Sequence, residues 1–203
     1  MGAYEVYLKN SRIPKLYQGD IKLIPSNADY NAFIKLNEIK KNIKQFVDEG
    51  QCLLIYSNYT GNGKTTWSTK LLKAYMNEVS SLGFSNNTPA VFINVNNFIN
   101  KTKIAISDLE VKEEVNNLKK LILDAKVVVF DELGDKNLSE YDLSLLYDLI
   151  DTRVCDMKSC IYTSNQEPLE LAKTLDGKLY SRVVQFTKNN HIKLTSRADM
   201  RGE

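Results

Sequence analysis

A nine-residue stretch, Asn58-Tyr59-Thr60-Gly61-Asn62-Gly63-Lys64-Thr65-Thr66, constrains the fold more than any other part of the chain. It directly follows the apolar run at residues 52–56 and leads into a segment of helical period at residues 64–79. Small residues in such a turn let consecutive backbone N–H groups hold phosphate oxygens, and the helix N-terminus adds its dipole. Lys64 is suited to the β- and γ-phosphates and Thr65 to Mg²⁺, so the stretch predicts a P-loop between a strand and a helix.

The P-loop departs from the usual glycine-rich pattern at one position, because Asn58 stands where the first glycine is expected. Asparagine tolerates a positive φ better than most residues, so the turn stays feasible. The alternative is a chance Gly-Asn-Gly-Lys-Thr sequence in an ordinary turn, but strand, loop and helix are all in register here. We therefore predict an ATP site formed by Asn58, Gly61, Asn62, Gly63, Lys64, Thr65 and Thr66, with Thr65 also binding Mg²⁺.

Short β-branched runs alternate with longer segments of helical period along the rest of the chain. Several of these runs are apolar nearly throughout, as in a parallel sheet that is covered on both faces. A capping box at Ser139 and the position of Pro168 mark the starts of two helices. The pattern predicts a three-layer α/β fold of the P-loop NTPase type, with a five-stranded parallel sheet flanked by helices. The predicted strands are residues 52–56, 90–94, 126–130, 159–163 and 183–186, and the predicted helices include residues 30–47, 64–79 and 109–123.

Composition limits the kind of protein that carries this site. A chain of 203 residues, 43% apolar and 26% charged, suits one globular domain that holds its core without disulfides. No apolar run is long enough to span a membrane, so we expect a soluble, cytoplasmic protein with no membrane partner. Cys52, Cys155 and Cys160 fit reduced core thiols. With His191 as the only histidine, a zinc cluster or a Ser-His-Asp triad is close to excluded.

Two adjacent acids, Asp131 and Glu132, end the apolar run at residues 126–130. A nucleotide site needs a carboxylate on a neighbouring strand for Mg²⁺ and its water shell, and Asp131 is placed for that role. Glu132 is then the candidate base that polarises the attacking water. The alternative is a solvated acidic turn, which the P-loop upstream makes the less favoured interpretation.

Two further polar residues follow later runs. Asn165 comes after the predicted strand at 159–163, at the sheet edge where open α/β sheets bind ligands, and could contact the γ-phosphate or the attacking water. Its alternative role is that of a turn residue. Arg182 precedes the predicted strand at 183–186 and could stabilise phosphoryl transfer in a neighbouring subunit. Its alternative role is a surface salt bridge.

Several short motifs together resemble the AAA+ ATPase domain of the DnaC/DnaI helicase loaders, and also the IstB-like transposition ATPases. The similarity covers residues 4–201, and it rests on the order and spacing of the motifs rather than on any single one. The motifs are the P-loop, Ile13-Pro14-Lys15-Leu16-Tyr17, Phe130-Asp131-Glu132-Leu133-Gly134, Thr163-Ser164-Asn165, Ser181-Arg182 and Arg197-Ala198-Asp199-Met200-Arg201.

The resemblance implies an ATPase that oligomerises on ATP, grips single-stranded DNA and delivers a ring-shaped helicase. It implies Walker A roles for Lys64 and Thr65, Walker B roles for Asp131 and Glu132, and a sensor 1 role for Asn165. It also implies that Arg182 is an arginine finger acting in trans and that Arg201 is a sensor 2 residue contacting the nucleotide.

The resemblance divides the chain into a short N-terminal segment, residues 1–12, and an AAA+ ATPase domain, residues 13–203. Loaders of this kind usually carry a helicase-binding or zinc-bearing domain before the AAA+ module. We therefore expect residues 1–12 to be a reduced docking element, or another surface or a separate chain to supply the contact, or the sequence to be a truncated form.

In related loaders the DNA-facing positions lie after the second strand and at the start of the helix after Walker B. An aromatic ring beside cations there suits base stacking and phosphate contact on single strands. A net charge of +2 does not by itself indicate nucleic-acid binding, and Phe98 and Ser139 have the equally good alternatives of a core residue and a helix cap. The candidate DNA-binding residues are Phe98, Lys101, Lys103, Ser139 and Tyr141.

The sequence therefore predicts an ATP- and Mg²⁺-dependent replicative helicase loader, with a ring-shaped helicase, single-stranded DNA and further copies of itself as partners. Its short, loader-only build favours a phage or mobile-element origin. One alternative is an IstB-like ATPase that assists a transposase. Another is a nucleotide-gated adaptor that inhibits a helicase and hydrolyses little ATP.

Overall fold

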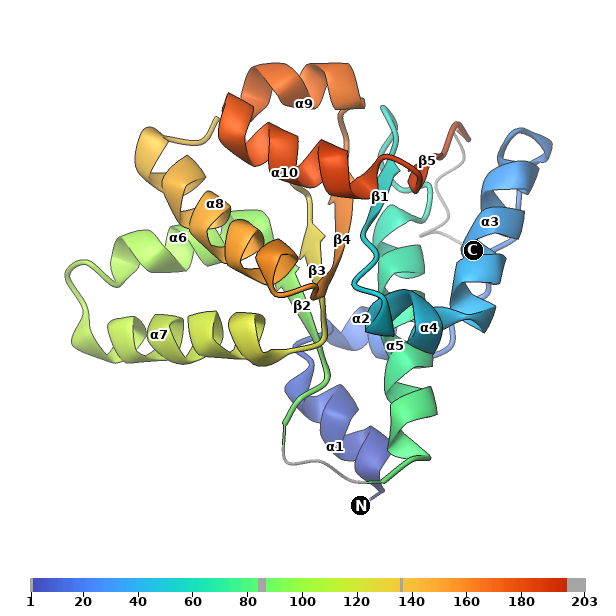
Figure 1. The fold of residues 1–203 in the computed structure, drawn as a ribbon, viewed down its shortest axis with the longest axis horizontal. Helices are drawn as coiled ribbons and strands as arrows, with labels where there is room; N and C mark the ends of the chain where they lie inside the picture. The colour runs from blue at the N-terminus through green and yellow to red at the C-terminus, as the bar shows by residue number, and fades with distance from the viewer. Residues whose placement is uncertain (1, 84–86, 136, 197–203) are drawn as a thin grey trace.

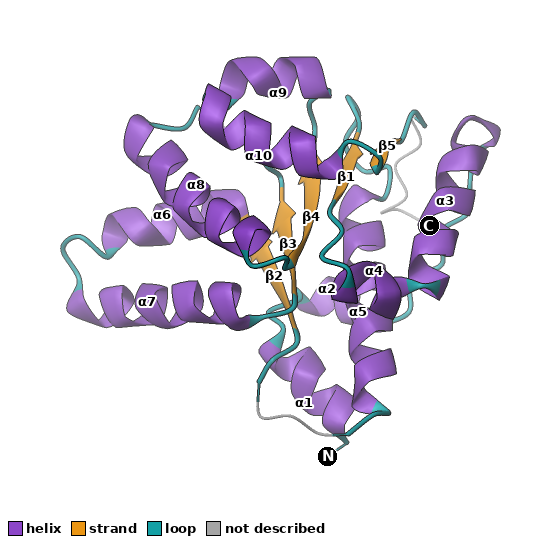
Figure 2. Cartoon of the chain, in the orientation of Figure 1, coloured by secondary structure: helices purple, strands orange, loops and turns teal. Residues whose placement is uncertain are grey.

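The computed structural model describes residues 2–83, 87–135 and 137–196. Within them lies a five-stranded sheet, ordered β2-β3-β4-β1-β5, in which every pair of neighbouring strands is parallel (Figures 1 and 2). This sheet confirms the predicted fold class. The strands are β1 (Leu53–Tyr56), β2 (Ala90–Asn94), β3 (Val127–Asp131), β4 (Ser159–Ser164) and β5 (His191–Lys193).

Helices cover both faces of the sheet, which makes the three layers that the sequence predicts (Figure 1). One layer consists of α1 (Ala3–Asn10), α2 (Lys15–Gln18), a 3₁₀ turn (Asn27–Asp29), α3 (Tyr30–Lys41), α4 (Ile43–Asp48) and α5 (Lys64–Ser80). The other consists of α6 (Val95–Ile104), α7 (Leu109–Asp124), α8 (Glu140–Cys155), α9 (Pro168–Thr174) and α10 (Gly177–Thr187).

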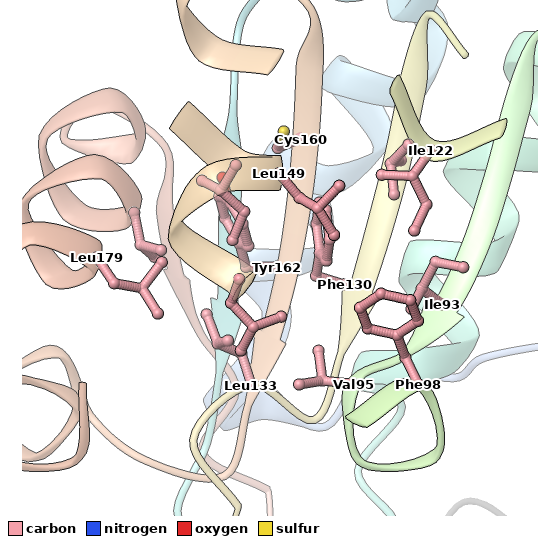
Figure 3. Close-up of a cluster of buried hydrophobic side chains, with 14 of the residues drawn as sticks. Ile93, Val95, Phe98, Ile122, Phe130, Leu133, Leu149, Cys160, Tyr162 and Leu179 are labelled. Carbon is pink, nitrogen blue, oxygen red and sulfur yellow. The ribbon is translucent and has the colours of Figure 1, made fainter. Parts of the chain in front are cut away.

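The core is divided by the sheet into two clusters of buried side chains. Val127 and Val129 of β3 pack toward α5, whereas Val128 and Phe130 pack toward α7 and α8. Figure 3 shows the second cluster, where Phe130 lies beside Tyr162 of β4 with a ring separation of 5.8 Å. Because both faces of the sheet are buried, successive residues such as Val127-Val128-Val129-Phe130 of β3 are all apolar instead of alternating with polar residues.

The prediction of a strand at residues 183–186 is wrong, because these residues belong to α10. The β-branched pair Val183-Val184 suggested a strand, but Leu179, Val183 and Thr187 form one buried face at helical spacing. The Asp176 side chain caps the helix by accepting a hydrogen bond from the Leu179 N–H at 2.7 Å. The fifth strand is instead the short segment His191–Lys193, which pairs with β1 at the sheet edge.

Smaller differences concern the helices. The segment at residues 30–47 is two helices, because Asn42 leaves the helical region with φ −112° and ψ 27°. Residues within the predicted N-terminal segment 1–12 form α1, whose buried Tyr7 joins the core on the α5 side of the sheet. Helix α6 was not predicted, although the Asn94 side chain caps it clearly by accepting a hydrogen bond from the Asn97 N–H at 3.1 Å.

Two further expectations concern the cysteines and the membrane. Cys52 and Cys160 are buried free thiols as expected, but Cys155 is exposed at the end of α8 and is not a core thiol. None of the helices in the described ranges is both long enough and apolar enough to cross a membrane.

Candidate nucleotide-binding site

The P-loop forms between β1 and α5, at the carboxyl edge of the sheet. Gly61 and Gly63 adopt φ values of 79° and 96°, a left-handed region that glycine enters without strain. Gly63 is also the N-cap of α5, so the first turn of a 17-residue helix faces the loop. The N–H groups of a first helical turn and the helix dipole favour an anion, so this geometry fits the predicted phosphate site.

Asn58 does not play the backbone part expected of it. Among the described residues other than glycine, a positive φ occurs only at Arg12, Glu132 and Met157. The expectation that asparagine suits this position because it tolerates a positive φ is therefore wrong. Its side chain instead donates a hydrogen bond to Glu167 Oε1 at 3.1 Å, and so ties the P-loop to the turn before α9.

The Lys64 ammonium group is held inside the loop. Its Nζ donates to the Tyr59 carbonyl at 2.7 Å and to Asn62 Oδ1 at 3.3 Å. Asn62 is fully buried, and its Nδ2 donates to Ser57 Oγ at 2.5 Å and reaches the Leu194 carbonyl at 3.5 Å. The loop therefore satisfies the lysine with neutral oxygens that a phosphate could replace.

Thr65 and Asp131 meet where a metal ligand pair is predicted. Thr65 Oγ1 and Thr163 Oγ1 donate to Asp131 Oδ1, at 2.9 Å and 2.7 Å respectively. Burial raises the pKa of Asp131 to about 6, although the two hydroxyl groups oppose that rise. A hard cation such as Mg²⁺ prefers this kind of oxygen and would favour the ionised carboxylate.

Thr65 and Asp131 alone do not complete the octahedral coordination shell of Mg²⁺, so the remaining ligands must be waters and phosphate oxygens. Within the part of the chain that the structure describes, no three His, Cys, Asp or Glu side chains gather into a metal cluster. Thr65 and Asp131 thus fit the usual Mg²⁺ arrangement of one or two protein oxygens, completed by waters and phosphate.

Glu132 is held in a strained backbone conformation beside Asp131. Its φ of 61° lies in the left-handed region, which costs a non-glycine residue energy and often marks a functional position. Its N–H donates to Thr163 Oγ1 at 3.0 Å, and its Oε2 accepts a hydrogen bond from Asn94 Nδ2 at 2.7 Å. Neighbouring strands therefore fix both the backbone and the carboxylate of Glu132.

Asn94 is a site residue that the sequence analysis missed. It ends β2 directly opposite Asp131 in the parallel register, so it lies at the same sheet edge as the two acids. In the sequence, Asn94 is a polar residue at the end of an apolar run, as Asp131 and Asn165 are. A single asparagine after a strand is too common to single out without the pairing of the strands.

Asn165 lies at the cavity as predicted, and its amide contacts a third acid. Its Nδ2 donates to Asp135 Oδ2, a residue that the sequence analysis also missed. The cavity around the P-loop is lined by Tyr17, Thr60, Gly61, Asn62, Gly63, Lys64, Thr65, Thr66, Glu132, Thr163, Ser164 and Asn165.

Tyr17 supplies the aromatic ring of this lining. It lies on α2, and Lys73 of α5 holds that segment by donating to the carbonyls of Tyr17 at 2.8 Å and Gly19 at 2.5 Å. In the sequence, only the resemblance to helicase loaders singled out the motif at residues 13–17. That Tyr17 lies beside the P-loop could be seen only from the folded structure.

Arg182 is not among the residues that line the cavity. Arg182 is on α10, not at the start of a strand, and its Nε forms an ion pair with Asp151 of α8. Arg201 lies outside the described residues. The predicted role of Arg182 in a neighbouring subunit remains a prediction.

The candidate DNA-binding residues separate into buried, paired and exposed groups. Phe98 is only 2% exposed and belongs to the core cluster of Figure 3. The prediction that this ring stacks on a DNA base is therefore wrong. Ser139 caps α8, Lys101 pairs with Glu114, and Lys103 pairs with Asp142. Tyr141, in contrast, is 56% exposed.

The fold and the site together define a class. The parallel sheet has the order β2-β3-β4-β1-β5, and the P-loop joins β1 to α5. The two adjacent acids lie at the end of β3, which is separated from β1 by β4. This is the architecture of an AAA+ P-loop NTPase.

Solved structures of replication proteins share this fold. The DnaC helicase loader aligns over 92% of this chain and 98% of its own, with a TM-score of 0.66 and 20% identity. DnaI aligns over 91% of this chain and 94% of its own, with a TM-score of 0.66 and 18% identity. The replication initiator DnaA bound to AMPPCP and single-stranded DNA aligns over 88% of this chain and half of its own, with a TM-score of 0.61 and 18% identity.

Comparison of the sequence with family models and curated proteins found no relative. No protein-family model matches the chain, and no curated protein matches it. At identities of 20% or less, the solved structures establish a shared fold.

Proposed function

We propose that this protein is an ATP-dependent loader of a ring-shaped replicative helicase, which assembles on ATP and binds single-stranded DNA. The observation that carries the proposal is the contact of Thr65 with Asp131, 2.9 Å apart, with Glu132 and Asn165 at the same cavity. Support for the loader class comes from the near-complete overlap with the DnaC helicase loader, 98% of that chain.

In this proposal the P-loop binds the triphosphate of ATP. The backbone N–H groups around Gly61 and Gly63 receive phosphate oxygens, and Lys64 exchanges the Tyr59 carbonyl for the β- and γ-phosphates. Thr65 and Asp131 would hold Mg²⁺, which supplies charge neutralisation at the terminal phosphates when bound. Tyr17, which lines the same cavity, would pack against the base.

Hydrolysis in this proposal depends on Glu132. Its carboxylate accepts a proton from the attacking water, and Asn165 faces the same cavity and orients that water. The Asn94 amide holds Glu132 Oε2 at 2.7 Å, so it limits where the base can point until the site is filled.

Nucleotide binding and turnover of paired variants test the proposal. Lys64→Ala should abolish binding of AMPPCP with Mg²⁺ in calorimetry, because it removes the cation that faces the phosphates. Glu132→Gln should keep binding and stop ATP turnover, because the amide cannot accept the proton. Lys70→Ala is the matched control, since Lys70 lies on the same helix α5 but does not line the cavity. Binding by Lys64→Ala at wild-type affinity would contradict the proposal.

For single-stranded DNA, the exposed surface favours Tyr141 over the buried Phe98. Tyr141 lines a second cavity together with Lys112 and Lys119. Ile106, which lines it too, is 78% exposed. An aromatic ring beside two lysines suits base stacking and phosphate contact on a single strand.

Fluorescence anisotropy with a labelled oligothymidine tests this DNA surface. Loss of one stacking ring costs about 1–3 kcal/mol, so Tyr141→Ala should weaken binding between about fivefold and a hundredfold. Tyr30→Ala is the matched control, because Tyr30 is also well exposed but lies on α3 in the other layer. Equal effects of the two variants would exclude Tyr141 as the contact.

A further inference from the structure

Asp135 and Asn165 join the turn after β3 to the turn after β4. Asp135 accepts hydrogen bonds from both the side-chain amide and the backbone N–H of Asn165. Around this contact, Ser164 Oγ donates to the Leu133 carbonyl at 2.7 Å and Gln166 Nε2 donates to the Gly134 carbonyl at 2.8 Å. The two turns therefore form one hydrogen-bonded unit, with Asn165 clamped at both its backbone and its side chain.

This clamp determines which end of the Asn165 amide is engaged. An ionised carboxylate can only accept hydrogen bonds, so the nitrogen of the amide, not its oxygen, must face Asp135. The oxygen is then directed away from Asp135. Asn165 lines the P-loop cavity, and no hydrogen bond from another described residue engages its oxygen, so this oxygen can accept a hydrogen bond from a molecule bound there.

Asp135 also lies in the electrostatic environment of the two groups expected to act on the terminal phosphate. Burial raises the pKa of Asp135, the hydrogen bonds from Asn165 oppose that rise, Glu132 adds to it and Lys64 reduces it. The carboxylate is thus near both the candidate base and the P-loop lysine, although it does not line the cavity itself.

We propose that Asp135 is a positioning residue, which holds the Asn165 amide so that its oxygen accepts a hydrogen bond from the attacking water. The inference rests on the proposed function. In the step concerned, the water oxygen bonds to the γ-phosphorus and the bond to the β–γ bridging oxygen breaks. ADP leaves with that electron pair, and the water proton passes to Glu132. Asp135 takes no part in the bond changes and acts only through Asn165.

Asp135→Asn is the informative variant, because it keeps the shape but allows an amide to donate. Asn165 can then turn its own amide over and present nitrogen to the water. We expect kcat for ATP hydrolysis to fall about tenfold, with KM and the AMPPCP dissociation constant within about twofold of wild type. Asp135→Glu should restore part of kcat, since a carboxylate again receives the amide nitrogen.

A double-mutant cycle separates positioning from a structural role. Asn165→Ala should lower kcat as much as Asp135→Asn, and the double variant should lower it no further, because the two residues act as one unit. Asp124→Asn, an exposed acid at the end of α7, is the control for loss of one negative charge and should leave kcat unchanged.

Four results would overturn the inference. The first is additive losses in the cycle, and the second is a rise in KM or in the AMPPCP dissociation constant that accounts for the whole effect. The third is wild-type protein that binds AMPPCP but shows no turnover, which removes the water step and leaves the nucleotide-binding part of the proposed function intact. Wild-type protein that binds no nucleotide overturns both.

Discussion

Three side chains from three elements converge on Asp131 and Glu132, which shows how the site is held at the scale of single residues. Thr65 comes from α5, Thr163 from β4 and Asn94 from β2. Thr65 belongs to the P-loop, whose spacing along the chain predicts its role. Thr163 and Asn94 act because parallel strands end side by side, a relation that the linear sequence does not display.

The same reason explains which candidate site residues could be predicted. The P-loop and Asp131-Glu132 carry their chemistry within a few consecutive residues, so the sequence identifies them. Asp135 belongs to the site because it contacts Asn165, and Tyr17 because it lies beside the P-loop. In both cases the partner is far away along the chain. Such contacts between separate elements need the strand order.

Asn94 has two separable roles, and a prediction follows from the separation. Its Oδ1 caps α6, while its Nδ2 holds Glu132. Asn94→Ser keeps a capping oxygen but is too short to reach the glutamate. We expect basal ATP turnover to rise about fivefold, because one hydrogen bond of about 1 kcal/mol no longer restrains the base. Steady-state kinetics measure the change, and thermal unfolding should show little loss of stability because the cap is kept. A lower or unchanged turnover would show that Asn94 does not restrain Glu132.

At the scale of elements, local sequence signals were reliable for strands β1 to β4 and failed for the edge strand β5. Strands β1, β2 and β3 are apolar nearly throughout, and β4 has the apolar centre Cys160-Ile161-Tyr162, because both faces of the sheet are buried. β5 is only three residues long and includes His191 and Lys193, so its sequence has no strand signature. The run at residues 183–186 was misleading because two β-branched residues outweighed the helix cap at Asp176.

Asp29 anchors the chain after β5 to the start of α3, and this contact should contribute strongly to stability. The carboxylate is fully buried and accepts hydrogen bonds from Thr195 N at 2.6 Å, Thr195 Oγ1 at 2.8 Å and Ser196 N at 3.0 Å. Asp29→Ala removes the buried acceptor of these three hydrogen bonds and should cost about 2–4 kcal/mol of unfolding free energy in urea denaturation.

Asp20→Ala is the control for Asp29→Ala, because Asp20 precedes the same helix but its side chain is 90% exposed. Its loss should change the unfolding free energy by less than about 1 kcal/mol. Equal losses for the two variants would mean that the buried contacts of Asp29 contribute nothing beyond its charge.

The ion pair between α6 and α8 should make stability depend on acidity. Burial of Asp142 opposes its ionisation, but the hydrogen bonds from Lys103 and Ser139 outweigh burial and hold the pKa of Asp142 below its ordinary value of 3.8. A lowered pKa in the folded state means that the stabilisation is present above the unfolded value and is lost as the pH falls through the folded value.

Asp142→Asn should therefore destabilise the protein most at neutral pH, and the difference from wild type should shrink as the pH falls below about 4. Urea unfolding at a series of pH values measures this difference. Asp148→Asn, an exposed acid on the same helix, should show no such trend. A difference that stays constant down to strong acid would mean that Asp142 stabilises the fold by shape and not by charge.

At the scale of the whole molecule, the sheet divides the core while its carboxyl edge collects the site. The P-loop, Asn94, Asp131 and Asn165 all follow the ends of parallel strands or lie at them, between the two layers of helices (Figure 1). Arg182 lies apart, on α10 in the layer formed by α6 to α10. No arginine is among the described residues that line the cavity, and the predicted role of Arg182 places its guanidinium at a nucleotide bound to another copy of the chain.

The contacts of Arg182 make a prediction about assembly. Arg182 pairs with Asp151 and is hydrogen-bonded to Tyr147, both on α8 of its own chain. To reach a phosphate in a neighbouring subunit, its guanidinium must leave these partners, so the ion pair opposes assembly. Asp151→Asn should lower the protein concentration at which ATP-dependent oligomers form, by about threefold as for the loss of a partly exposed ion pair.

Arg182→Ala should have the opposite effect, because it removes the finger itself, and ATP-driven oligomers and turnover should both disappear while the monomer still unfolds cooperatively. Arg182→Lys should resemble the alanine variant, since an ammonium group cannot bind two phosphate oxygens as a guanidinium does. Sedimentation velocity with and without AMPPCP measures assembly for all of these variants. If Arg182→Ala assembles and hydrolyses ATP as the wild type does, then Arg182 serves only the salt bridge with Asp151, and the finger must be sought on another element.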